Sequence, residues 1–81
     1  MDVLYFAWVR ERIGHPKERI DPSPATVMDL VNHLRAKEER YAVAFADLGA
    51  LRVAVDQELS DFDASLVNAR EVAFFPPMTG G

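Results

Sequence analysis

A single amphipathic helix, placed between two pairs of extended apolar segments, constrains this chain more than any other feature. Its apolar positions recur at i, i+3, i+4 and i+7, and so share one helix face: Val27, Leu30, Val31 and Leu34. Thr26 precedes them as an N-cap, with Asp29 three residues later near the positive end of the helix dipole. A chain of 81 residues builds one small core, so this helix must cover one face of one sheet.

The segments around the helix have the composition of β-strands. Strands are predicted over residues 3–9, 17–21, 51–56 and 71–75, with a loop or short strand at 57–66. A polar connection is expected over residues 10–16, a turn at 68–70, and a second short helix over residues 41–48 that ends at Gly49. This order indicates an α+β fold, and the compact fold that fits it is the β-grasp. The first and last strands would then pair in parallel at the centre of a mixed sheet.

The sheet is expected to have a second apolar face that the helix leaves open. In the first strand, Asp2 and Arg10 favour water, so the residues of the same parity, Leu4, Phe6 and Trp8, should point away from the helix. The opposite parity should face the helix: Val3, Tyr5 and Ala7. In the last strand, Val72 and Phe74 should point inward and Ala73 and Phe75 outward.

Phe6, Trp8 and Phe75 are therefore predicted to form an exposed patch, which Leu59 would extend. Burying each such side chain is worth about 1.5–3 kcal/mol, and contiguous apolar patches of this kind mark binding surfaces. The alternative is that residues 41–48 fold over the patch. Aromatic enrichment at interface centres favours a partner-binding surface.

The chain ends on a tail, residues 76–81, that follows a domain of residues 1–75. Pro76 and Pro77 cannot continue a central strand and favour an extended exit, and the tail spans at most about 20 Å. Gly80 and Gly81 have no β-carbon, so the tip is thin enough to enter a partner's narrow active site. Met78 and Thr79 would add modest grip there. The alternative is an ordinary frayed terminus.

Composition excludes several classes of function. The net charge is −4 and the basic residues are dispersed, which argues against nucleic-acid binding. The absence of cysteine excludes disulfides, thiolate metal sites and a cysteine nucleophile. His15 and His33 are isolated, so no metal site is expected. No apolar run is long enough for a membrane span and no signal peptide is recognisable, so the expected location is cytoplasmic.

Four segments together resemble a known family. They are residues 3–11 (VLYFAWVRE) with Gly14, Thr26 and Val27 with Leu30, residues 51–57 (LRVAVDQ) and residues 71–81 (EVAFFPPMTGG). The chain resembles the ubiquitin-like sulfur carriers that form the small subunit of molybdopterin synthase, over nearly its whole length. The turn at residues 68–70 departs from the Asp-Gly turn common in that family.

The resemblance implies a function for the C-terminus. Gly81 would be adenylated by an activating enzyme, because this chain has no phosphate-binding loop and a terminal carboxylate is a poor electrophile. ATP would be used by that partner and no cofactor would be bound here. A sulfur donor protein would then convert Gly81 to a thiocarboxylate, which attacks cyclic pyranopterin monophosphate within the synthase.

The resemblance further implies a heterotetramer of two large and two small subunits, in which this chain donates sulfur without catalytic side chains of its own. Phe6, Leu59 and Phe75 match the family's docking positions. Two alternatives stay open: a sulfur carrier of the thiamin pathway, and a ubiquitin-like interaction or modifier module.

Overall fold

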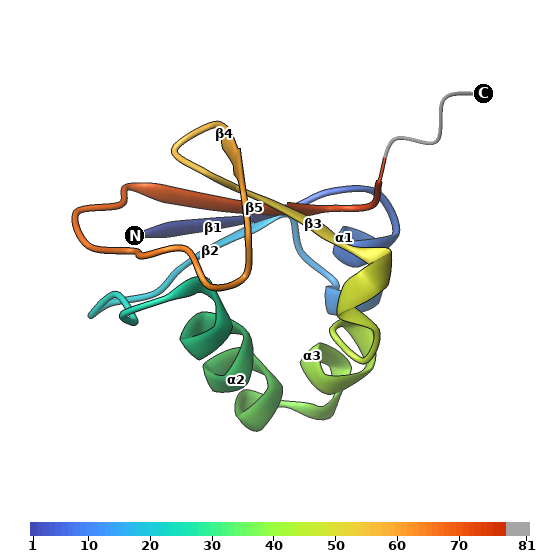
Figure 1. Cartoon of the computed structure of the whole chain (residues 1–81). Coiled ribbons are helices and arrows are strands. Elements are labelled where there is room, and N and C mark those ends of the chain that lie inside the picture. The colour runs from blue at the N-terminus through green and yellow to red at the C-terminus, as the bar shows by residue number, and fades with distance from the viewer. Residues whose placement is uncertain (78–81) are drawn as a thin grey trace.

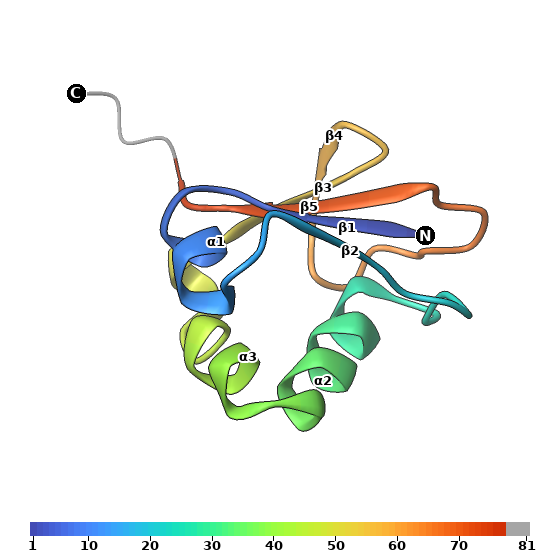
Figure 2. The same ribbon diagram turned by 180° about the vertical axis from the view of Figure 1, so that it is seen from behind.

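Helices cover one side of a five-stranded sheet in the computed structural model, which describes residues 1–77 (Figures 1 and 2). The strands are β1 (Asp2–Tyr5), β2 (Lys17–Arg19), β3 (Arg52–Val55), β4 (Glu58–Ser60) and β5 (Glu71–Phe75). The helices are α1 (Ala7–Ile13), α2 (Val27–Lys37), α3 (Glu39–Ala44) and the short 3-10 helix η1 (Leu48–Ala50).

The strand order is β2-β1-β5-β3-β4. The two central strands, β1 and β5, pair in parallel, and the other pairs are antiparallel. This is the β-grasp fold, as the order of segments predicts. The expected edge strand at residues 17–21 is confirmed as β2, although β2 ends at Arg19. The segment 57–66 contains the short strand β4.

The core lies between the sheet and α2, as predicted. Val3, Tyr5, Val72 and Phe74 point inward from the two central strands and are buried. They meet the predicted apolar face of α2: Val27, Leu30, Val31 and Leu34, all buried. Thr26 caps this helix by accepting a hydrogen bond from the Asp29 amide at 3.2 Å. The helix and strand patterns therefore lead to one consistent core.

The prediction for the end of the first strand is wrong. β1 ends at Tyr5, whereas the strand was predicted to reach Val9. Ala7 adopts a left-handed conformation (φ 52°) and begins α1. This helix takes the place of the end of the predicted strand and the start of the predicted polar connection. The physical reason is that Val9 and Ile13, one helical turn apart, are both fully buried. A helix directs both into the core, and Gly14 ends it with a φ of 97°.

The second short helix forms earlier in the chain than predicted. α3 begins at Glu39 and ends at Ala44, while Gly49 lies inside η1. The helix ends where the Phe45 side chain enters the core, and the Arg35 guanidinium donates a hydrogen bond to the Phe45 carbonyl. Tyr41 and Phe45 are buried beside the inward-facing rings of Tyr5 and Phe74, so this segment lies on the helix side of the sheet and does not cover the opposite side.

A polar cluster on the helix side ties the edge strand β2 to α2 and α3. The Glu18 carboxylate accepts hydrogen bonds from Tyr5 (2.8 Å), Lys37 (2.9 Å) and Tyr41, and His15 Nε2 lies 3.2 Å away. Burial raises the pKa of this carboxyl, but the hydrogen bonds outweigh burial and hold the pKa of Glu18 at about 2. Burial, reinforced by Glu18, raises the pKa of both tyrosines. His15, expected to be isolated, belongs to this structural cluster.

Candidate partner-docking face

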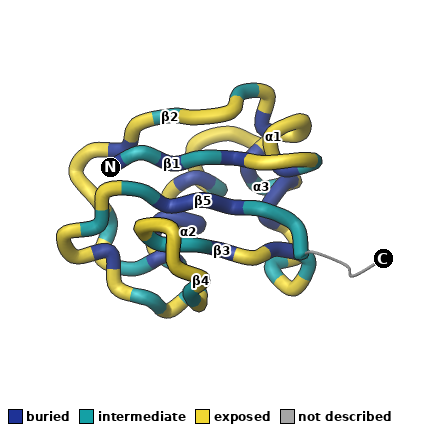
Figure 3. Tube along the Cα trace, turned by 90° about the horizontal axis from the view of Figure 1, so that it is seen from above, coloured by how far each residue is buried: buried dark blue, intermediate teal, exposed yellow. Residues whose placement is uncertain are grey.

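The side of the sheet opposite the helices carries a continuous apolar row. Strand register places Leu4 beside Ala73, Ala73 beside Ala54, and Ala54 beside Leu59, so one row crosses β1, β5, β3 and β4. Residues opposite each other in a ladder point to the same face. Figure 3 views the sheet from this side. We call this side the open face.

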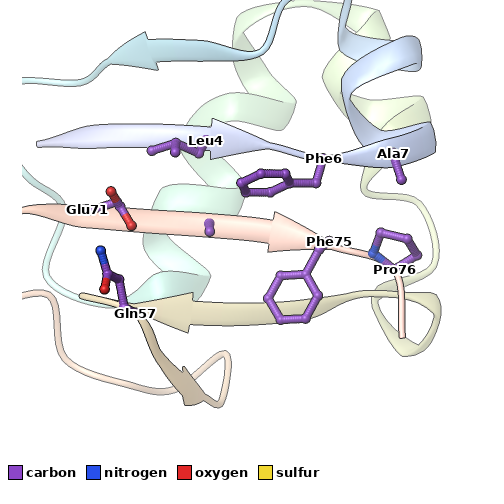
Figure 4. Close-up of a pocket in the computed structure, with 8 residues that line it drawn as sticks. Leu4, Phe6, Ala7, Gln57, Glu71, Phe75 and Pro76 are labelled. Atoms are coloured by element: carbon purple, nitrogen blue, oxygen red, sulfur yellow. The ribbon is translucent and has the colours of Figure 1, made fainter. Parts of the chain in front are cut away.

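A hollow in the open face runs along β5, from Glu71 at its start to Pro76 just beyond its end (Figure 4). Its lining is mainly apolar: Leu4, Phe6, Ala7, Ala73, Phe75 and Pro76. Figure 4 shows Glu71 and Gln57 at one end of this hollow, and Phe75 and Pro76 at the other. The geometry suits an apolar group of a partner protein, since an apolar hollow with a few polar groups at its edge combines hydrophobic burial with orientation.

The predicted parity of the two central strands holds as far as Phe6. Phe6 is 44% exposed and Phe75 is half-buried, and both line the hollow. Leu59 is 73% exposed on β4 and lies outside the lining of the hollow, but it ends the same apolar row. Ala73 points outward as expected, yet only 8% of it is exposed because its neighbours shield so small a side chain.

Trp8 is not part of the open face, contrary to the prediction. It lies on α1, where it is half-buried against the core, and the Arg12 guanidinium lies 4.6 Å from the ring centroid. Ala7, predicted to point inward, is exposed and lines the hollow. Both errors follow from extending the strand alternation past Tyr5. The sequence did contain a signal for the helix, because the apolar residues Val9 and Ile13 have the i, i+4 spacing of one helix face. Both are buried in the structure.

Gln57 and Glu71, the polar end of the hollow, were not among the predicted site residues. Asp56 and Gln57 both have positive φ, 49° and 70°, in the tight connection between β3 and β4. The Asp56 carboxylate accepts hydrogen bonds from the amides of Arg70 (2.9 Å) and Glu71 (3.0 Å). These two hydrogen bonds fix the backbone at the start of β5 and thereby the position of Glu71.

The tail leaves the sheet directly from the open face. Pro76 lines the hollow and Pro77 is half-buried. The remaining predicted tail residues, Met78, Thr79, Gly80 and Gly81, lie outside the described residues. Within residues 1–77 no cluster of side chains has the makings of a metal site. In the same range, none of the helices has both the length and the apolar character that a membrane span requires.

The sheet order, with a helical layer on one side and the other side left open, defines this chain as a β-grasp domain of the ubiquitin-like type. Residues 3–81 match the family described as ThiS family. The chain is 46% identical over 79 residues to the molybdopterin synthase sulfur carrier subunit of Escherichia coli (strain K12), covering 98% of this chain and 96% of that protein. The chain therefore belongs to the ThiS family.

Two further comparisons agree. The molybdopterin synthase sulfur carrier subunit of Haemophilus influenzae is 38% identical over 81 residues, covering 100% of this chain and 99% of that protein. The crystal structure of SAMP1 from Haloferax volcanii has a TM-score of 0.78 and 25% identity, covering 100% of this chain and 98% of that one. The fold and the family predicted from the sequence are confirmed.

Proposed function

We propose that this chain is the sulfur carrier subunit of a molybdopterin synthase, and that the terminal carboxylate of Gly81 carries the sulfur. Support comes from two relatives of that name that match over the full length. The observation that carries the proposal is the position of Pro76, which lines the hollow of the open face five residues before the chain ends. A partner docked on that face has the terminus within at most about 18 Å.

Loading requires a partner that binds ATP. A carboxylate resists substitution because its leaving group would be an oxide ion, so it must first be activated. In the proposed step, the Gly81 carboxylate attacks the α-phosphate of ATP in the activating enzyme and releases pyrophosphate. A sulfur donor protein then supplies sulfide, which replaces AMP at the carbonyl carbon and leaves a thiocarboxylate.

Transfer takes place in the large synthase subunit. The thiocarboxylate is a soft nucleophile that attacks a side-chain carbon of cyclic pyranopterin monophosphate, where a carbon–sulfur bond replaces a carbon–oxygen bond. Hydrolysis of the resulting thioester leaves sulfur on the pterin and a carboxylate on Gly81. A dithiolene contains two sulfurs, so two loaded carriers are used for each product, in a heterotetramer of two large and two small subunits. Acid and base groups belong to the large subunit, and this chain is a donor without catalytic side chains.

Docking places the tail for this reaction. Phe6, Phe75 and Pro76 supply the hollow, and Leu59 extends the apolar contact across the sheet. Pro77, Met78 and Thr79 would line the passage through which Gly80 and Gly81 reach the reacting pterin. Each side chain fully buried in such an interface is worth about 1.5–3 kcal/mol.

A reconstituted reaction tests the function. The loaded chain, the large subunit from the same genome and cyclic pyranopterin monophosphate should yield the dithiolene product with two carriers consumed. A thiamin-pathway carrier would instead give no pterin product but would supply sulfur to thiazole formation. A modifier would form an isopeptide bond from Gly81 to a lysine, visible as a covalent adduct.

A further inference from the structure

Glu71 is the charged residue at the edge of the docking hollow. It is the first residue of β5 and has the same parity as Ala73 and Phe75, so it belongs to the open face. Figure 4 shows its side chain at the end of the hollow opposite Phe75. It is half-buried, so a partner that covers the hollow also removes water from this carboxylate.

The Glu71 carboxylate has no partner within residues 1–77: no hydrogen bond or ion pair there involves it. Asp2, its neighbour on β1, does have charged partners. The Asp2 carboxylate lies 3.4 Å from Arg19 and 3.9 Å from Lys17, both on β2. Arg70 lines an adjoining depression together with Glu71, without an ion pair between the two side chains. Among the residues that line the hollow, Glu71 is therefore the one with an uncompensated charge.

We propose that Glu71 is a specificity-determining residue of the open face. It would pair with a lysine or arginine of the large synthase subunit, next to the apolar group that fills the hollow. This inference rests on the proposed function. Covering an ionised carboxylate without a counter-charge is costly, so a partner surface that lacks the cation is rejected.

The position of Glu71 also gives the ion pair a geometric role. Phe75 lies four positions further along β5, a distance of about 13 Å, and the tail begins just beyond Phe75. The hydrogen bonds that the amides of Arg70 and Glu71 donate to the Asp56 carboxylate hold the backbone at Glu71 in place. An ion pair at one end of the hollow and an apolar contact at the other would fix the direction in which the tail enters the large subunit.

The test measures binding of the unloaded full chain to the recombinant large subunit at low and high salt. Four variants are compared with the original: Glu71→Gln, Glu71→Lys, Glu58→Gln and Phe75→Ala. Glu58 is the matched control, because it is exposed and lies opposite Val55, a residue that packs on the core side of the sheet. Thermal unfolding of each variant confirms that the fold is retained.

Glu71→Gln should weaken binding about tenfold at low salt and Glu71→Lys more, while Glu58→Gln stays within about twofold. The loss should shrink at high salt because screening weakens the pair. The ion pair is disproved if Glu71→Gln binds the large subunit as well as Glu58→Gln does, or more tightly than the original chain. If Phe75→Ala binds weakly in the same experiment, the docking face still stands. If Phe75→Ala also binds normally, the proposed docking itself fails.

Discussion

The Phe6 amide donates a hydrogen bond to the Phe74 carbonyl at 3.1 Å, which extends the parallel pairing of β1 and β5 one residue past the end of β1. The chain turns away into α1 immediately afterwards, at Ala7. Phe6 is thereby held beside the end of β5, where it lines the same hollow as Phe75. This bond keeps an aromatic side chain on the open face although the strand has ended.

Replacing Phe75 by alanine should impair docking and not folding. Phe75 lies half-buried on the open face, so its loss should cost about 1 kcal/mol of stability and weaken binding to the large subunit at least tenfold. Phe74 is the matched control, since it is the adjacent residue, is fully buried and packs edge-on against Phe45. Phe74→Ala should cost about 3–5 kcal/mol of stability. Equal destabilisation of the two variants in chemical unfolding would refute the assignment of faces.

Leu59→Ser should weaken binding to the large subunit several-fold and change the free energy of unfolding by less than about 0.5 kcal/mol. The reason is that Leu59 is 73% exposed and contributes to the apolar row of the open face. Val67 has the same exposed fraction in the loop before β5, so Val67→Ser is the control and should bind normally. Calorimetric titration and thermal unfolding measure both quantities. Normal binding by Leu59→Ser would limit the docking surface to the hollow.

Glu18→Gln should lower the free energy of unfolding by about 2 kcal/mol at neutral pH, because the carboxylate accepts hydrogen bonds from two tyrosines and a lysine. In the folded chain the pKa of Glu18 is lowered from 4.5 to about 2. The stabilisation is therefore complete above about pH 4.5 and is lost as the pH falls towards 2. Unfolding curves of both proteins from pH 7 to pH 2 should converge, and a constant difference between them would contradict this account.

The sequence predicts the central strands, the main helix and the core because each pattern there is regular. β5 and α2 have one side-chain period from end to end, and Thr26 marks the start of α2 with a specific hydrogen bond. Phe6 and Phe75 were placed on the open face by parity alone, and the hollow confirms this placement. Length limits the chain to one helical layer, which leaves the second face of the sheet open.

The helix α1 escaped prediction because an apolar run of seven residues fits a strand or a helix equally well. The change from one to the other depends on Ala7, whose positive φ no residue preference predicts. The cluster around Glu18 joins residues from β1, β2, α2 and α3, a tertiary arrangement that sequence spacing does not reveal. Gln57 and Glu71 were missed for the same reason, since the hollow brings together a residue of the β3–β4 connection and the first residue of β5.

The central claim is that partners load sulfur onto the terminal carboxylate of Gly81, and intact-mass spectrometry tests it most directly. The full chain, incubated with its activating enzyme, ATP and a sulfur donor, should gain about 16 Da, the difference between sulfur and oxygen. A variant lacking Gly81 should fold with the same thermal stability and gain nothing. A full chain that keeps its original mass under these conditions, or a shortened chain that gains sulfur, would contradict the proposed function.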